Sequence, residues 1–181
     1  MDEFITPATT SSTTSKLDDK DKKMSIWGNV NSERVSDDPF FTPANTYHCT
    51  VIDAKMQQKD GRNSLTIQWA IDDPSSDYHG NRLSQYFQLP ADGQNFEDLD
   101  SNQRKSLAFL KQTLRRGFDF SEQPNSDGVS IDNVSPSDLM GRSAYLTVKV
   151  NDKYSNVNKV VCPRLYEEER EQNQVAESLG L

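Results

Sequence analysis

Lysine, arginine and tyrosine residues recur in three stretches of this sequence, and their side chains suit a nucleic-acid ligand. Lysine and arginine neutralise phosphates and release counterions, while an exposed tyrosine ring can stack on a base. Any one of the cations is by itself more typical of a solvated surface, and each tyrosine could equally cover a neighbouring strand. The prediction therefore depends on a shared face. The candidate residues are Lys59, Arg62, Arg82, Tyr86, Tyr145, Lys149, Lys153, Tyr154 and Lys159.

The segment 144–161 shows the pattern most clearly. Over 144–150, apolar residues alternate with a tyrosine, a threonine and Lys149, as in a strand with one buried face. A polar turn over 151–156 leads to a second strand at 157–161. An ordinary half-buried hairpin with a solvated lysine explains this segment equally well.

The motifs of common enzymes are absent. The sequence has no phosphate-binding loop, HExxH, GxSxG or dinucleotide fingerprint. Asp72, Asp73 and Asp77 are close enough in sequence to suggest a metal-dependent nuclease. They lie, however, in a turn rich in proline and serine, where aspartate is favoured for local hydrogen bonds. We therefore expect no catalytic activity.

Metal or cofactor binding is not expected either. The chain has two histidines, and its two cysteines, Cys49 and Cys162, are 113 positions apart. This spacing does not fit a zinc site. A disulfide between them is possible, but two reduced thiols in an intracellular protein are the favoured interpretation.

Composition limits the chain to one modest domain with tails. A length of 181 residues fits a single domain, while a hydrophobic content of 33% and a mean hydropathy of -0.82 indicate that part of the chain is disordered. The formal charge of -8 argues against a generic basic nucleic-acid binder, but residues 43–165 carry 15 acids and 14 bases. We divide the chain into a disordered Ser/Thr-rich leader (1–25), a folded domain (26–165) and a disordered acidic tail (166–181).

Neither end of the chain indicates export or membrane insertion. The N-terminus lacks the basic-then-apolar pattern of a signal peptide, and no apolar run approaches the length of a membrane span. We expect a soluble protein of the cytoplasm with no membrane partner.

Alternating patterns predict three strands in the first part of the domain. They are 47–56, 65–72 and 82–89. The pair Asp60-Gly61 is a strong signal for a hairpin between the first two strands. Trp69 shares its face with leucine and isoleucine residues, so we expect it in the core rather than on DNA, and the same argument buries Phe87.

A helix is predicted after the third strand. Asp100 or Ser101 can cap its start, it runs to about Arg116, and Gly117 suits its C-terminal end. Three strands, a helix and two strands is the element order of an OB barrel, which binds oligonucleotides on its second and third strands and through the loops joining strands one to two and four to five. The sequence therefore predicts a mainly β, OB-fold-like five-stranded barrel, with the candidate residues in those positions.

Short motifs of the chain resemble a known family. They are Pro-Ala-Asn-Thr-Tyr at 43–47, His-Gly-Asn-Arg at 79–82 before a strand ending in Tyr-Phe-Gln-Leu, Asp-Leu-Met-Gly-Arg at 138–142, and Tyr-Ser-Asn-Val-Asn at 154–158. These motifs look like those of small tailed-bacteriophage proteins, some of which bind single-stranded DNA. The resemblance covers roughly 26–165 and implies an accessory of phage DNA replication or recombination in the host cytoplasm, rather than an enzyme. This chain departs from the family in having Asn45 in place of glycine, and in its long leader.

The acidic tail has three interpretations. The acids within 167–171 could mimic phosphates and compete with DNA, could dock onto basic replication or recombination proteins, or could be solvated without function. The tail ends in Ser-Leu-Gly-Leu, without the aromatic tip found on the acidic tails of bacterial single-strand binders.

Two functions of different classes remain open from the sequence. The first is a single-stranded-DNA-binding protein with little sequence preference, which the placement of lysine and tyrosine favours. The second is a protein-interaction adaptor or structural virion component without nucleic-acid binding, which the net acidity favours. An uncovered sheet edge would also allow a homo-oligomer.

Overall fold

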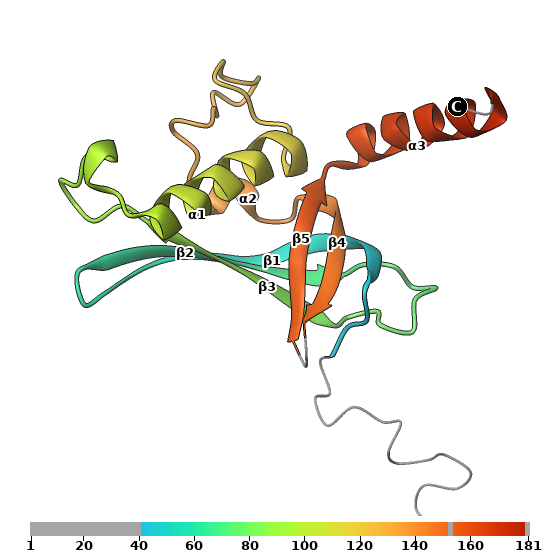
Figure 1. Cartoon of the computed structure of the whole chain (residues 1–181), viewed down its shortest axis with the longest axis horizontal. Helices are drawn as coiled ribbons and strands as arrows, with labels where there is room; N and C mark the ends of the chain where they lie inside the picture. Colours follow the sequence, from blue (N-terminus) through green and yellow to red (C-terminus); the bar gives the residue numbers. More distant parts are fainter. Residues whose placement is uncertain (1–40, 152–153, 180–181) are drawn as a thin grey trace, which may run out of the picture. The chain divides into compact units, whose positions relative to one another are not determined.

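The computed structural model describes residues 41–151 and 154–179 as a mainly β domain (Figure 1). The predicted leader, 1–25, and one candidate residue, Lys153, lie outside the described residues. Within the described part of the chain, no helix combines the length and the apolar character needed to cross a membrane.

All the predicted strands are present and form one antiparallel sheet with the order β3-β2-β1-β4-β5. The strands are β1 (Asn45–Lys59), β2 (Arg62–Ile71), β3 (Arg82–Leu89), β4 (Ser143–Asn151) and β5 (Tyr154–Val161). Lys59 pairs with Arg62, and the two residues between them, Asp60 and Gly61, have φ angles of 52° and 72°. This is the type I′ hairpin turn that the Asp-Gly pair predicts.

The core lies on one face of the sheet. Trp69 and Phe87 are both 0% exposed, as predicted. The Trp69 ring stacks on Phe118 with 5.4 Å between ring centroids, and its indole N–H donates to the Gln85 side-chain oxygen at 2.9 Å. This buried hydrogen bond satisfies the indole N–H of Trp69 in the absence of water, and the rest of the ring makes apolar contacts.

The predicted helix begins and ends close to the expected residues. The 3₁₀ turn η2 (Phe96–Asp98) precedes α1 (Ser101–Gln112), whose N-terminal N–H groups donate to the side chain of Asp100. A π-helical turn, η3 (Thr113–Gly117), continues it to Gly117. After a loop that contains the short helix α2 (Pro136–Leu139), the chain enters β4. Figure 1 shows α1 lying along the sheet, where Phe109 contacts Phe87.

Close packing, rather than backbone conformation, explains why residue 117 at the end of η3 is a glycine. Gly117 is not one of the described residues with a positive φ angle. A Cβ atom added at this position, however, would lie 2.6 Å from Cγ1 of Val160. The absence of a side chain therefore lets η3 approach β5 closely.

Gly117→Ala should consequently destabilise the protein by about 1–3 kcal/mol through overpacking, as measured by urea denaturation. Helix propensity alone would make the same change stabilising, by up to about 1 kcal/mol. Adding Val160→Ala relieves the contact. The double variant should therefore lose less free energy of unfolding than the two single variants lose together. A stabilised single variant would contradict the steric explanation.

The predicted closure of the sheet into a barrel is wrong. β3 and β5 are the two edges of the sheet, and no strand pairing joins them, although parts of the two strands approach within 8 Å between Cα atoms. Groups near both edges are used elsewhere. The Gln88 N–H of β3 donates to the Ser106 hydroxyl of α1 at 2.7 Å. Just after β5, the Cys162 N–H donates to the Arg116 carbonyl at 2.6 Å. Because helical segments take up these groups, a closing ladder does not form.

The prediction of a disordered C-terminal tail is also wrong for the residues that the structure describes. Helix α3 (Pro163–Leu179) follows β5 after a single residue, Cys162. Its first turns are held by the hydrogen bond from the Tyr166 N–H to the Cys162 carbonyl (3.0 Å) and by pairs of Arg164 with Asp119 and Glu168. The weak apolar pattern of this segment hid the helix, because polar contacts rather than a broad apolar face tether it.

Candidate nucleic-acid interface

The described candidate residues share the face of the sheet opposite the core, which we call the outer face. Strand register places them there. Tyr86 pairs with Thr66 and Tyr145 with His48, in positions that alternate with buried residues. Lys59 pairs with Arg62 at the hairpin tip, and the register puts this pair on the same face. The residues of this face are Lys59, Arg62, Arg82, Tyr86, Tyr145, Lys149, Tyr154 and Lys159.

On the side of β3, the outer face presents a ring and three cations. Lys59 and Arg62 flank the turn at the tip of the β1–β2 hairpin, and both side chains are exposed. Arg82 begins β3, and Tyr86 follows on the same face with 67% of its surface exposed. An exposure this large leaves the ring of Tyr86 free to meet a ligand.

On the side of β5, the exposed members are Lys149 and Tyr154. Tyr154 pairs with Asn151 beside the hairpin turn and is 75% exposed. Lys149 is two residues before Asn151 on the same face of β4 and is also exposed.

The two groups approach each other where β3 and β5 begin. Asn81, next to Arg82, donates to the Phe41 carbonyl at 3.4 Å. Ser155, next to Tyr154, donates to the Thr42 carbonyl at 2.6 Å and accepts from the Thr42 N–H at 3.1 Å. Because Phe41 and Thr42 are consecutive, the beginnings of the two strands lie side by side. Residues 41–42 thus link the beginnings of β3 and β5, although no strand pairing joins the two strands.

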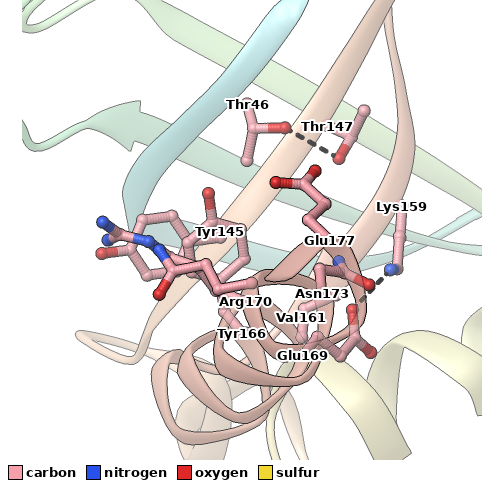
Figure 2. Close-up of a pocket in the computed structure, with 11 residues that line it drawn as sticks. Thr46, Tyr145, Thr147, Lys159, Val161, Tyr166, Glu169, Arg170, Asn173 and Glu177 are labelled. Atoms are coloured by element: carbon pink, nitrogen blue, oxygen red, sulfur yellow. Dashed lines mark hydrogen bonds and ion pairs between the residues drawn. The ribbon is translucent and has the colours of Figure 1, made fainter. Parts of the chain in front are cut away.

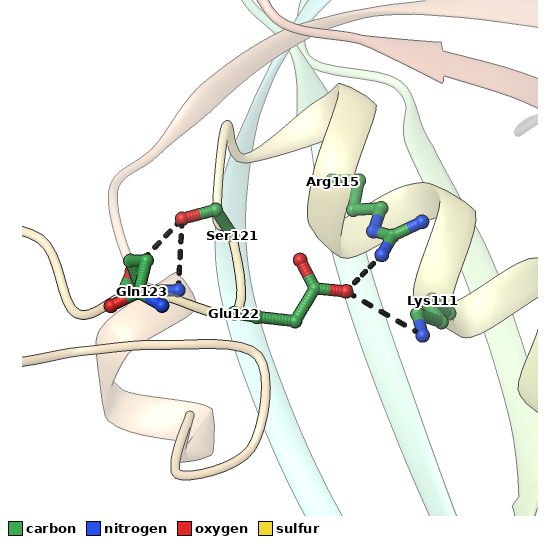
Figure 3. A network of polar contacts seen from close by, with 5 residues as sticks. All are labelled: Lys111, Arg115, Ser121, Glu122 and Gln123. Carbon is green, nitrogen blue, oxygen red and sulfur yellow. Dashed lines mark hydrogen bonds and ion pairs between the residues drawn. The ribbon is translucent and has the colours of Figure 1, made fainter.

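The cations of this face differ in their partners. Within 41–151 and 154–179, none of the side chains of Lys59, Arg62, Arg82 and Lys149 has a carboxylate within 4.0 Å, whereas Lys111, Arg115 and Arg116 of α1 and η3 pair with glutamates. Figure 3 shows Glu122 between Lys111 and Arg115, which it pairs with in one network. The four cations of the outer face without an ion pair in the described part of the chain are available to a phosphate, as are exposed cations elsewhere, such as Lys105 and Arg170.

Tyr145 and Lys159, in contrast, are covered by α3. The rings of Tyr145 and Tyr166 stack with centroids 3.9 Å apart and 16° between planes. The Lys159 ammonium pairs with the Glu169 carboxylate at 2.9 Å, and the Arg116 guanidinium pairs with its other oxygen. Hydrogen bonding to Lys159, with the nearby Arg116 charge, lowers the pKa of Glu169. These two candidates are brought to the outer face but are occupied by the chain itself.

A cavity of about 390 Å³ lies between α3 and the outer face (Figure 2). Its floor includes Thr46 and Thr147, whose hydroxyls are 3.1 Å apart on β1 and β4. Its wall includes Arg170 and Glu177 of α3. A volume in this range is typical of a small-ligand site, and polar groups line both of its sides.

Three contributors to this surface were missed from the sequence. The sequence predicts Arg116 only as the approximate end of the helix, and it assigns Tyr166 and Glu169 to the disordered acidic tail. One signal was present: Tyr166 and Glu169 are three residues apart, which places them on one face if the segment is helical. That they would meet Tyr145 and Lys159 depends on the direction in which the chain leaves β5.

Asp73, in the turn after β2, makes the local hydrogen bonds that the composition of this turn predicts. The Asp73 carboxylate accepts from the Ser75 N–H and hydroxyl at 2.9 and 2.6 Å, and these bonds lower the pKa of Asp73. Asp72 instead accepts from the Thr50 hydroxyl at 3.0 Å. In the described ranges, no cluster of three histidine, cysteine, aspartate or glutamate side chains is arranged to hold a metal ion.

Both cysteines are free and buried in the domain. Burial, with a smaller contribution from the Asp72 charge, raises the pKa of the Cys49 thiol to about 12. Cys49 is therefore a thiol at neutral pH and a poor nucleophile.

Comparison of the sequence with protein-family models and with curated proteins found no match. The phage-protein family suggested by the short motifs therefore stays a prediction. What the surface can bind follows from its own geometry: exposed rings and unpaired cations on one face.

Proposed function

We propose that this protein binds single-stranded DNA with little sequence preference, along the outer face of its sheet. One observation carries the proposal. Tyr86 and Tyr154, 67% and 75% exposed, lie on that face together with Arg82 and Lys149, which have no ion pair among the described residues. Rings for bases and cations for phosphates are the two elements of a surface for single strands.

The topology supports the same proposal. The order β3-β2-β1-β4-β5, with α1 between β3 and β4, is the order of an OB fold opened between its third and fifth strands. In that fold, oligonucleotides contact the second and third strands and the loops one–two and four–five, which here correspond to the positions of Tyr86, Lys59 and Tyr154. We infer a partly open OB-like domain.

The chemistry of the surface favours tolerance of sequence over readout. Every base has a flat face that a tyrosine can stack on, and lysine and arginine contacts to phosphates carry no sequence information. A protein of this kind would protect or organise strands opened during phage DNA replication or recombination, the role that the family resemblance implies. Proteins of those processes are the expected partners.

A salt titration with a fluorescent oligothymidylate tests the proposal. If four cations neutralise phosphates, log K should fall linearly with log[salt] with a slope of roughly -3, since each single-strand contact contributes about -0.7. Fluorescence anisotropy measures the affinity at each salt concentration. Absence of saturable binding even at low salt would overturn the proposal.

One observation favours the alternative, a protein-interaction adaptor. An apolar cavity of about 230 Å³ lies between the β1–β2 hairpin and α1, and Met56, one of its lining residues, is 59% exposed. Exposed apolar surface of this kind is a feature of protein-binding sites. The salt titration separates the two functions, because an adaptor would show no saturable binding of the oligonucleotide.

A further inference from the structure

Two side chains of α3 contact the outer face as the parts of a nucleotide would. The Tyr166 ring lies flat on Tyr145, at 3.9 Å between centroids, which is the position of a stacked base. The Glu169 carboxylate lies between the Lys159 ammonium and the Arg116 guanidinium, which is the position of a phosphate. Figure 2 shows Tyr145 with Tyr166 and Lys159 with Glu169 beside the same cavity.

Glu169 of α3 engages only part of the Arg116 guanidinium. One of its terminal nitrogens pairs with Glu169, but its Nε is buried and has no hydrogen-bond partner within 41–151 and 154–179. A guanidinium can donate two parallel hydrogen bonds to a phosphate, so a ligand with more acceptor oxygens than a carboxylate could engage this nitrogen as well.

The contacts of α3 with the sheet are few. Beyond Glu169, the helix borders the cavity rather than packing on the strands, and Val175 is 56% exposed. The helix is held by one ring stack, by the ion pairs of Glu169 and, near its start, by the pair of Arg164 with Asp119. The part of the helix beyond Arg164 can detach at a low free-energy cost, because little apolar surface is exposed when it leaves. Its connection to β5 through Cys162 and Pro163 leaves the core strands in place when it moves.

We propose that Tyr145, Lys159 and Arg116 form a one-nucleotide subsite, and that α3 fills this subsite with Tyr166 and Glu169 until a strand displaces it. This inference rests on the proposed function. A base replaces the Tyr166 ring on Tyr145, and a phosphate replaces the Glu169 carboxylate between the two cations. The subsite extends the surface around Tyr86 and Tyr154, and it is the part of that surface whose access depends on α3.

A pair of charge-matched variants tests the subsite. Glu169→Gln removes the carboxylate that pairs with Lys159 and Arg116, whereas Glu171→Gln removes an exposed carboxylate of the same helix that has no ion pair in the described part of the chain. Oligothymidylate affinity, measured by anisotropy at low salt, should tighten about two- to fivefold in the first variant and change much less in the second. Tyr166→Ala combined with Glu169→Gln should tighten it further, by roughly fivefold or more in total.

A second measurement reports on the helix directly. Hydrogen exchange of the α3 amides should become faster when wild-type protein binds the oligonucleotide, since the helix leaves its contacts. Slower exchange would mean that α3 closes over the strand, and would overturn displacement. Thermal unfolding of each variant shows whether the domain is intact.

The possible outcomes separate the subsite from the proposed function. Equal tightening by Glu169→Gln and Glu171→Gln would reduce the effect to overall charge and reject the subsite, while DNA binding itself stands. Wild-type binding that neither variant alters would also reject it. If neither the wild type nor any variant binds the oligonucleotide at low salt, the proposed function fails and the subsite with it.

Discussion

Replacing both Tyr86 and Tyr154 by alanine should weaken oligothymidylate binding by about 2–6 kcal/mol, because each base stacked on an aromatic ring contributes roughly 1–3 kcal/mol. The two rings lie on the same face of the sheet, Tyr86 within β3 and Tyr154 at the beginning of β5. A single strand of DNA that crosses from β3 to β5 can contact both tyrosine rings. The loss corresponds to at least a tenfold weaker affinity, which anisotropy at a fixed low salt concentration resolves.

The double variant should keep its fold. Because the two side chains are 67% and 75% exposed, their truncation should change the free energy of unfolding by less than about 0.5 kcal/mol per residue. Phe96→Ala is the matched control, since Phe96 is 65% exposed but lies in η2, away from the strands. An unaltered affinity in the double variant would show that stacking is wrongly assigned, even if the protein binds DNA by its cations.

Replacing Trp69 by alanine should destabilise the protein by about 3–5 kcal/mol, the range found when a large buried aromatic ring is removed from a core. Trp69 is fully buried, and its removal leaves a cavity beside Phe118. It also removes the donor to the Gln85 side-chain oxygen, while the Gln85 side-chain nitrogen already lacks a partner among the residues that the structure describes. A buried amide with no hydrogen bond adds a further cost of about 1–3 kcal/mol.

Trp69→Phe separates the two contributions. Phenylalanine keeps most of the ring volume but cannot donate to Gln85, so its loss of unfolding free energy should be clearly smaller than that of alanine. Urea denaturation of both variants measures the difference. A loss below about 1 kcal/mol for Trp69→Ala would mean that Trp69 is not part of the packed core, and would reopen its role as a surface ring.

Much of the local structure could be predicted because it depends on residues close in sequence. The Asp60-Gly61 turn follows from the tolerance of these residues for positive φ. The start of α1 follows from the Asp100 carboxylate, which accepts from N–H groups two and three residues later. The burial of Trp69 follows from alternation within one strand. Alternation also places Arg82, Tyr86, Tyr145 and Lys149 on the face away from the core, which the register confirms. The turns predicted at 57–63 and 151–156 hold Lys59, Arg62 and Tyr154, which reach the same face because the strands extend further than predicted.

The errors concern contacts between distant parts of the chain. Whether a five-stranded sheet closes depends on its two edges, and here α1 and η3 take up groups near those edges. The C-terminal tail was predicted to be disordered but forms α3 for the same kind of reason. The segment has little apolar character, but Tyr145, Lys159 and Arg116 supply partners from three other elements.

The amino-acid sequence by itself determined the strands, the helix after the third strand, the hairpin turn and the face on which lysine and tyrosine residues gather, because alternation and capping act over a few residues. Only the tertiary structure decided that this sheet stays open, that β3 and β5 begin side by side, and that α3 covers Tyr145 and Lys159. The physical reason is that these features depend on pairs such as Thr42 with Ser155 and Arg116 with Glu169, which are 113 and 53 residues apart. No local pattern encodes which of many possible distant partners a side chain will meet.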